Sequence, residues 1–175
     1  MINVKDTKKE FVKLLEDTDI KSVLDLGCGK AIMSEFFAKR GAKVKGIDIK
    51  NVERKIANFE FIQGDFRKFD LKEEYDLIIA SLVINFLEKE SALKFIQRIK
   101  NATSKEGYNL LICMSNKDSL AKKRLENFYP TIQELENIYS DWKVIKRLID
   151  ITEVEEHNGQ GPHQHHLIFL LTQNK

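Results

Sequence analysis

Hydrophobic positions along this chain follow two alternating periods. Short apolar runs recur, and the segments between them carry apolar residues at helical spacing, as Ile32, Phe36 and Phe37 do. The run from Tyr75 to Val83 is almost continuously apolar, which is typical of a central strand buried on both faces. Strands that alternate with helices in this way indicate a mainly parallel sheet covered by helices on both sides.

The boundaries of the elements follow from these periods and from turn residues. We expect strands over Ser22–Leu26, Val44–Ile49, Phe59–Gln63, Tyr75–Val83, Asn109–Met114, Trp142–Val154 and His166–Thr172. We expect helices over Thr7–Leu15, Ile32–Arg40, Glu88–Asn101 and the lysine-rich Asn116–Asn127, a helix opened by Pro130-Thr131, and a short helix or turn over Asn51–Ala57. Thr131 and Glu134 have the spacing of a capping box.

The last two strands follow one another without a helix between them. They are joined by the short stretch HNGQGPH, which predicts an antiparallel hairpin. The fold class is therefore α/β, with a doubly wound, mainly parallel seven-stranded sheet and a C-terminal antiparallel hairpin. With neither a repeat nor a linker in the sequence, we expect a single domain over residues 1–175.

Composition narrows the function classes. Hydrophobic residues make up 42% and charged residues 32% of the chain, as in ordinary globular proteins, and the formal net charge of +2 gives no support for a nucleic-acid partner. The N-terminus is polar, and the apolar runs are too short to span a bilayer. Two cysteines make no disulfide framework, so we expect a reducing, cytoplasmic setting, and we expect a monomer.

A glycine turn follows the first strand in VLDLGCGKA, residues 23–31. Gly27 and Gly29 allow backbone to approach a ligand, and the next helix points its N-terminal amides at the same place. The third glycine of a dinucleotide fingerprint is replaced by Ile32, which counts against NAD or FAD, and there is no Walker A pattern.

Acidic residues lie at successive strand ends. Asp25 lies within the first strand, Asp48 ends the second, and Asp65 follows the third. An acid at the tip of the second strand suits ribose hydroxyls, and a carboxylate at Asp25 suits an ammonium and a sulfonium better than a pyrophosphate. For each acid taken singly, a structural role is as well supported as ligand binding. Asp25 would cap a helix, Asp48 would belong to a surface turn, and Asp65 would form an Asx turn. Three such acids at successive strand ends favour an adenosine ligand.

The four stretches VLDLGCGKA, VKGIDI, FIQGDF and YDLIIASLVINFL resemble, in order and spacing, the motifs of class I S-adenosylmethionine (SAM)-dependent methyltransferases. The resemblance implies that Asp25, Gly27, Cys28 and Gly29 line the methionine end of SAM, that Asp48 holds the ribose hydroxyls, that Ile49, Asp65 and Phe66 contact the adenine, and that Ser81 and Leu82 flank the methyl group. Cys28 has no paired base, so we expect no nucleophile there. Ala31 stands where many members of the family have glycine. Because its side chain is small, we expect SAM binding to tolerate this difference.

The acceptor is harder to predict, because methyl transfer is a direct displacement that needs alignment and needs a base only for acceptors that lose a proton. The stretch SLVINFL lacks the proline motif of amino-methylating nucleic-acid enzymes, although Asn85 is placed to contact a substrate. All four histidines lie in HNGQGPHQHH, and we expect His157 and His163 near the substrate mouth. For these histidines, a role as a base or substrate ligand and a role in packing are equally supported. A metal site ranks lower, so we assign no metal.

The sequence thus predicts a SAM-dependent methyltransferase with a small-molecule acceptor, and with His157, His163 and Asn85 as candidate catalytic residues. The histidine-rich end resembles that of some small-molecule and tellurite-type methyltransferases. An RNA or protein methyltransferase and a non-catalytic SAM-binding module stay open as alternatives.

Overall fold

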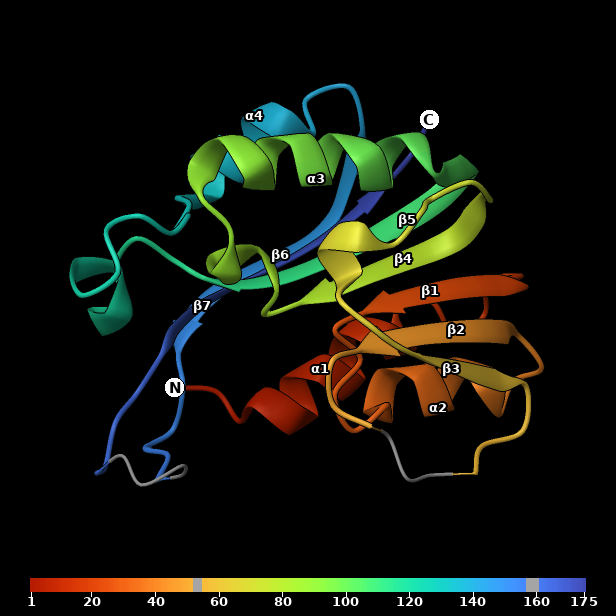
Figure 1. The fold of residues 1–175 in the computed structure, drawn as a ribbon, viewed down its shortest axis with the longest axis horizontal. Helices are drawn as coiled ribbons and strands as arrows, with labels where there is room; N and C mark the ends of the chain where they lie inside the picture. Colours follow the sequence, from red (N-terminus) through yellow and green to blue (C-terminus); the bar gives the residue numbers. More distant parts are fainter. Residues whose placement is uncertain (52–54, 157–160) are drawn as a thin grey trace.

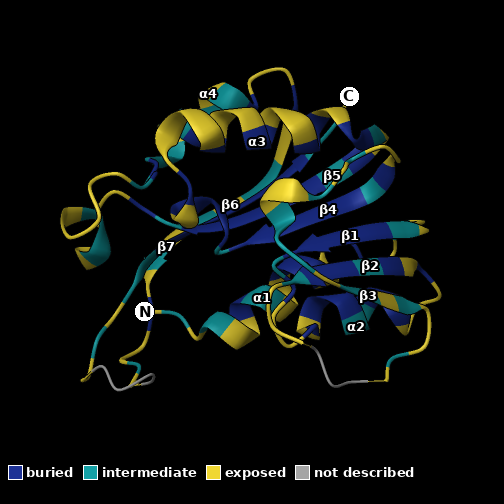
Figure 2. Cartoon of the chain, in the orientation of Figure 1, coloured by how far each residue is buried: buried dark blue, intermediate teal, exposed yellow. Residues whose placement is uncertain are grey.

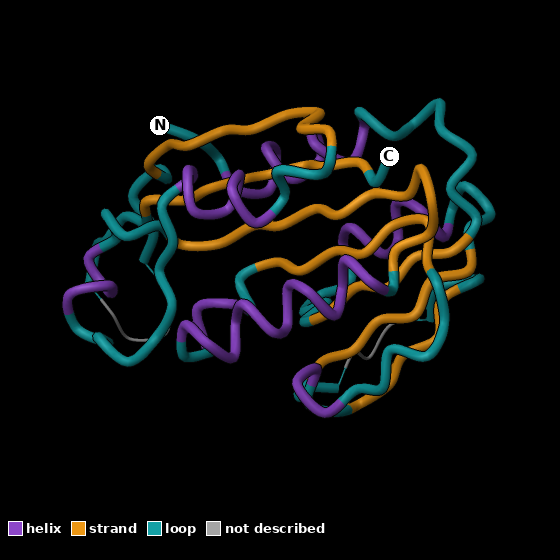
Figure 3. The backbone as a smooth tube through the Cα atoms, turned by 90° about the horizontal axis from the view of Figure 1, so that it is seen from above, coloured by secondary structure: helices purple, strands orange, loops and turns teal. Residues whose placement is uncertain are grey.

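The computed structural model describes residues 1–51, 55–156 and 161–175, and within these residues seven strands form one sheet. The strand order is β3-β2-β1-β4-β5-β7-β6. The first five strands of this order pair in parallel, whereas β7 is antiparallel to both β5 and β6. The strands twist relative to one another when the sheet is seen from above (Figure 3). The predicted fold class is confirmed, including the antiparallel hairpin.

The elements have the following bounds. The strands are β1 Ser22–Leu26, β2 Lys43–Asp48, β3 Phe59–Gln63, β4 Tyr75–Ser81, β5 Thr103–Met114, β6 Lys143–Ile151 and β7 His166–Gln173. The α-helices are α1 Val4–Lys13, α2 Ile32–Ala38, α3 Lys89–Asn101 and α4 Ile132–Ile138, and the 3₁₀ turns are η1 Phe66–Lys68, η2 Ile84–Phe86 and η3 Ser119–Lys122.

Helices cover both faces of the sheet, with α1 and α2 on one side and α3 and α4 on the other (Figure 1). Each face has its own apolar cluster, and most residues of the central strands β1 and β4 are buried (Figure 2). Successive residues of a strand point to opposite faces, so Leu77 and Ile79 of β4 join the α1–α2 cluster while Ile78 and Ala80 join the α3–α4 cluster. The apolar run of β4 is therefore continuous because both faces of this strand are buried.

The direction of chain progression across the sheet reverses between β1 and β4. From β1 the chain moves outward through β2 and β3, and from β4 it moves the other way through β5. In open α/β sheets, ligands bind beyond the carboxyl ends of the strands at such a switch point. The glycine turn after β1 and the end of β4 lie at this position, because Leu26 pairs with Ala80.

The sequence-based boundaries differ from the structure at several ends. The first helix begins at Val4 rather than Thr7, because Asn3 caps it by accepting from the Asp6 amide. The fifth strand extends back to Thr103. The sixth ends at Ile151, after which an isolated bridge between Glu155 and His163 continues the hairpin. The capping box of α4 is confirmed at both of its hydrogen bonds. The prediction for Asn51–Ala57 lies partly outside the described residues.

The prediction of a helix over Asn116–Asn127 is wrong. This stretch holds only the short turn η3, whose first amides are capped by Asp118. Its two leucines, Leu120 and Leu125, do not fall on one helical stripe, and Leu125 is exposed. Lysines alone provide no apolar face to pack, so the segment forms turns instead of a helix.

Candidate cofactor and acceptor site

The glycine turn leaves β1 with two residues in the left-handed region, Gly27 at φ 73° and Gly29 at φ 53°. The amides of Gly27 and Cys28 both donate to the carbonyl of Ile47, at 2.8 and 3.0 Å, and so tie the turn to β2. A Cβ at Gly27 would lie 2.3 Å from Cγ1 of Val83, whereas one at Gly29 would meet nothing within 4 Å. Glycine is needed at position 27 for both conformation and space, and the backbone at Gly29 is open to a ligand.

Ala31 also adopts a left-handed conformation, with φ 55° and ψ 31°, at the residue that precedes α2. An L-residue costs about 1–2 kcal/mol there, which gives a physical reason for glycine at this position in similar turns. The alanine is completely buried, and the turn keeps its course with the methyl group in place. The departure from the family pattern is therefore accommodated in the backbone.

Asp25 is fully buried beneath the turn. Its Oδ2 accepts a 2.6 Å hydrogen bond from the Ser34 hydroxyl of α2, while no donor among the described residues reaches Oδ1. Burial raises the pKa of this carboxyl to about 6, against the opposing effects of the Ser34 hydrogen bond and of the Lys8 charge. The helix-capping alternative for Asp25 is partly present, because the Ser34 hydroxyl that it binds lies in the first turn of α2, although the N-cap residue itself is Ala31.

Asp48 ends β2 and connects the glycine turn to the loop that follows. Its Oδ2 accepts from the Gly29 amide at 2.8 Å, and its Oδ1 accepts from the Lys50 amide at 2.9 Å. The carboxylate is half-buried, and the next side chain, Ile49, is 66% exposed. Asp48 thus orders the turn. Each of its oxygens can still accept a second hydrogen bond, so the carboxylate could bind two neighbouring hydroxyls of a ligand.

Asp65 follows β3 and caps η1 by accepting from the Arg67 amide at 2.9 Å. The Arg67 guanidinium also binds this carboxylate, with Nη2 at 2.6 Å from Oδ2, and these hydrogen bonds lower the pKa of Asp65. Phe66 packs edge-on against Phe95 of α3, with ring centroids 5.2 Å apart. The Asx-turn alternative for Asp65 is therefore present, and a ligand amine would have to share this carboxylate with Arg67.

Ser81 and Leu82 end β4 beside the glycine turn. The Ser81 side chain is buried, and its hydroxyl has no hydrogen-bond partner within the described part of the chain. Leu82 has φ 58°, an uncommon conformation for a leucine, and its amide donates to the Ile112 carbonyl of β5 at 2.7 Å. Strain of this kind costs about 1–3 kcal/mol and is concentrated at functional sites in proteins.

Asn85 is buried, and its amide is used by backbone groups. Its Nδ2 donates to the carbonyls of Met114 and Phe128, both at 2.9 Å, and its Oδ1 accepts from the Met114 amide at 2.7 Å. These bonds join the end of β5 to the segment before α4. Both hydrogens of the Asn85 amide are thus used within the protein, which gives Asn85 a positioning role at the end of the sheet. The predicted substrate contact of Asn85 stays a prediction.

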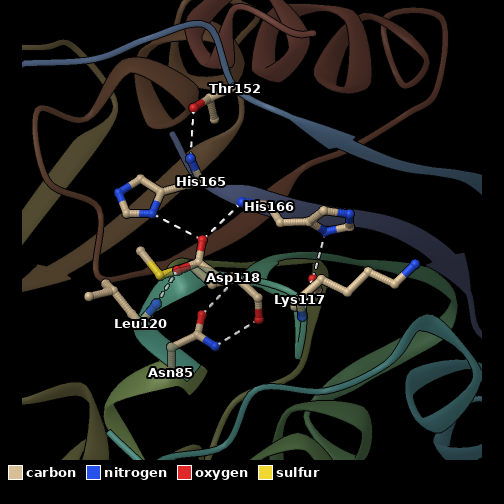
Figure 4. A network of polar contacts seen from close by, with 9 residues as sticks. Asn85, Lys117, Asp118, Leu120, Thr152, His165 and His166 are labelled. Carbon is tan, nitrogen blue, oxygen red and sulfur yellow. Dashed lines mark hydrogen bonds and ion pairs between the residues drawn. The ribbon is translucent and has the colours of Figure 1, made fainter. Parts of the chain in front are cut away.

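The C-terminal histidines meet a buried carboxylate, Asp118, that the sequence interpretation missed (Figure 4). Its Oδ2 accepts from the His166 amide at 2.9 Å and lies 3.1 Å from Nδ1 of His165, while its Oδ1 accepts from the Leu120 amide. A carboxylate only accepts, so Nδ1 of His165 carries the hydrogen and Nε2 is the basic nitrogen of the neutral ring. On the other side, the Ser115 hydroxyl contacts Nδ1 of His166 at 2.6 Å.

A cavity of about 320 Å³ opens between η3 and the β6–β7 hairpin. It is lined by Ser119, Leu120, Lys123, Gly161, Pro162, His163 and His165. The rings of His163 and His165 meet edge to face with centroids 5.1 Å apart, so these two side chains share one side of the hairpin. His157 lies outside the described residues, and among those that are described no group of three or more His, Cys, Asp or Glu is arranged to hold a metal ion.

Comparisons with known proteins show the family of the chain. The family model of tellurite resistance protein TehB matches residues 2–169. The chain belongs to the TehB family. A relative named a probable SAM-dependent methyltransferase TehB, from Haemophilus influenzae, is 26% identical over 148 residues, which are 79% of this chain and 52% of the relative. The chain therefore spans about half the length of the curated TehB relatives that it matches.

Solved structures show the same fold. The crystal structure of TehB from H. influenzae superposes with a TM-score of 0.79 at 22% identity, over 95% of this chain and 62% of that one. The N-methyltransferase NodS from Bradyrhizobium japonicum, in complex with S-adenosylhomocysteine, has a TM-score of 0.72 at 14% identity, over 97% and 86%. Within the described residues, no helix is long and apolar enough to cross a membrane.

Proposed function

We propose that this TehB-family chain transfers a methyl group from SAM to a small-molecule acceptor. The observation that carries the proposal is a pair of buried polar atoms, Oδ1 of Asp25 and Oγ of Ser81, which have no partner among the described residues. They lie at the ends of adjacent strands, beside the glycine turn and at the switch point. Buried polar atoms are nearly always hydrogen-bonded, so a ligand is the natural partner for both.

The residues present fit the parts of SAM. Asp25 offers a carboxylate oxygen to the ammonium. Gly27 and Cys28 hold the course of the turn, and Gly29 offers open backbone to the methionine chain. Asp48 offers acceptors to the ribose hydroxyls, Ile49 and Phe66 offer apolar surface to the adenine, and Asp65 offers an acceptor to its amine. When bound, SAM supplies an electrophilic methyl group on a sulfonium. Ser81 and Leu82 end β4 where that methyl group would be flanked.

Proton transfer is assigned to the histidine side of the site. His165 is held by Asp118, which leaves Nε2 free to take a proton from an O–H, S–H or N–H acceptor. His163 belongs to the same hairpin, whereas the candidate His157 lies outside the described residues. Asn85 positions the β5 end that leads to Ser115 and η3. The size of the cavity, about 320 Å³, supports a small acceptor.

Calorimetry with S-adenosylhomocysteine tests the cofactor assignment. Asp48→Ala is expected to weaken binding by about 1.5–3 kcal/mol, the value of hydrogen bonds to a charged group. Asp70→Ala, which removes an exposed aspartate paired with Lys72, is the matched control and should bind normally. If wild-type protein binds NAD better than S-adenosylhomocysteine, or if Asp48→Ala binds as wild type does, the assignment fails.

Release of S-adenosylhomocysteine in a panel of acceptors tests the reaction. The panel includes tellurite, because of the family's name, together with phenols, thiols and amines. With a protic acceptor, His165→Gln is expected to lower the rate about a hundredfold or more, whereas an acceptor that is already anionic needs no base. Turnover only with RNA or protein would favour the macromolecular alternative, and binding without turnover would favour a non-catalytic module. A reducing cytoplasmic setting, which the two free thiols support, and a monomeric state are further proposals.

A further inference from the structure

Thr152 lies at the base of the β6–β7 hairpin, one residue after β6 ends, and it is completely buried. Its amide donates to the His165 carbonyl at 2.8 Å, and its hydroxyl oxygen accepts from the His165 amide at 2.9 Å. In a regular antiparallel pair, the second of these bonds would go to the carbonyl of Thr152. That carbonyl instead accepts from the Gln164 side chain at 2.8 Å. The Thr152 hydroxyl therefore replaces a backbone acceptor next to the start of β7.

His165 is held at two separate points, its backbone by Thr152 and its ring by Asp118 (Figure 4). Because β7 begins at His166, His165 lies just outside the regular ladder of that strand. Nδ1 of its ring lies 3.1 Å from Oδ2 of Asp118, and the side chain is only 12% exposed. A ring that is fixed at Nδ1 while its backbone is fixed elsewhere keeps Nε2 pointing in one direction.

The N-terminal segment holds Thr152 from the other side, and in the fold it lies beside the hairpin (Figure 1). Ile2 pairs in parallel with Thr152, because its amide donates to the Ile151 carbonyl and its carbonyl accepts from the Glu153 amide, both at 2.9 Å. Asn3, which caps α1, also donates to the Glu153 carboxylate at 3.1 Å. Thr152 is thus bonded on both sides, and its hydroxyl is an acceptor fixed in space.

We propose that Thr152 is a positioning residue for His165, the base of the proposed function. Its hydroxyl sets the backbone of His165 so that the ring meets Asp118 through Nδ1 and keeps Nε2 for the acceptor. This inference rests on the proposed function and extends it to a residue outside the strand-end motifs. A role in packing alone would predict a loss of stability and no selective effect on proton transfer.

Thr152→Val tests the hydroxyl, because valine keeps the shape of threonine but cannot accept from the His165 amide. With a protic acceptor, this variant is expected to lower kcat by about 10- to 100-fold, the scale of loss for a group misplaced by about 1 Å. With an acceptor that is already anionic, kcat should change less than about twofold, because no base is needed. Binding of S-adenosylhomocysteine should stay as in wild type. Thr152→Ser keeps the hydroxyl and should recover most of the rate.

The tautomer of His165 gives a readout that needs no turnover. At about pH 8, where histidine rings are ordinarily neutral, nitrogen NMR of the ring should show the hydrogen on Nδ1 in wild type. Thr152→Val should mix the two tautomers. Asp118→Asn, whose side-chain amide can donate to Nδ1, should favour the other tautomer. The signals of His165 are those that disappear in His165→Gln.

Ser22→Ala is the matched control, because the Ser22 hydroxyl also accepts from a backbone amide, that of Asp76 at 3.0 Å, at the opposite end of the sheet. It should lower the melting temperature as Thr152→Val does, and leave the tautomer of His165 and both rates unchanged.

The inference is overturned if folded Thr152→Val keeps either the wild-type tautomer of His165 or the wild-type kcat with the protic acceptor. Equal slowing with both kinds of acceptor would overturn it too, because that result indicates structural damage alone. The same holds if His165→Gln turns over a protic acceptor as fast as wild type does. If wild type binds no S-adenosylhomocysteine, the proposed function itself fails, whereas the tautomer comparison still decides whether Thr152 positions the ring.

Discussion

Replacement of Asp25 by asparagine is expected to stabilise the ligand-free protein while it weakens the cofactor site. The carboxyl is fully buried, and its pKa rises from its ordinary 3.8 to about 6. A tenfold change in proton affinity is worth about 1.4 kcal/mol, so ionised Asp25 costs the folded state about 3 kcal/mol. Asparagine keeps an oxygen to accept from Ser34 and has no charge to desolvate.

The sign of the pH dependence follows from the direction of the pKa change. Because the folded protein holds the Asp25 proton more tightly than the unfolded chain does, the cost is small below about pH 4 and grows through the interval up to about pH 6. The gain in unfolding free energy from Asp25→Asn is therefore expected to be about 0.5 kcal/mol at pH 4 and about 3 kcal/mol at pH 8. Other titrating groups cancel in the difference between the two proteins.

Urea unfolding at these two pH values measures the effect, with Asp70→Asn as an exposed control that should show no such dependence. Calorimetry of the same protein at pH 8 should show S-adenosylhomocysteine bound about tenfold or more weakly, because its ammonium loses a charged acceptor. A variant that is less stable than wild type at pH 8, or a gain that is equal at pH 4 and pH 8, would refute the reasoning. The expected result would mean that the Asp25 carboxylate serves ligand binding and lowers the stability of the folded protein.

Three further substitutions probe the turn and the core. Ala31→Gly should change the unfolding free energy by less than about 1 kcal/mol, because relief of the left-handed strain offsets the conformational entropy that glycine adds to the unfolded chain. A decrease of more than about 2 kcal/mol in the unfolding free energy, measured by urea titration, would contradict this. Gly27→Ala should destabilise by about 2–4 kcal/mol through strain and its clash with Val83, and a normal urea midpoint would exclude that clash. Tyr139→Phe should cost about 1–3 kcal/mol in thermal unfolding, because it orphans the buried Oδ1 of Asn109, and an unchanged melting temperature would mean that the bond contributes nothing.

Much of the fold was predictable because it depends on local pattern. The period of apolar residues indicated each strand of the sheet, and the paired strands at the end predicted the antiparallel hairpin. The prediction of a helix over Asn116–Asn127 failed, because a run of lysines does not indicate whether a helix would have an apolar face to bury. The positions of Asp25 and Asp48 at strand ends were also predictable, since parallel strands bring their carboxyl ends to one edge.

The sequence by itself determined the strands of the sheet and the acids beside the glycine turn, because these follow from periodicity and from neighbours in the chain. Only the tertiary structure decided which side chains share a site when their partners are distant in sequence. Asp118 meets His165 near the start of β7, and the Asn85 amide joins the end of β5 to Phe128. No local signal marks such residues, since burial and charge pairing exist only once the layers have packed.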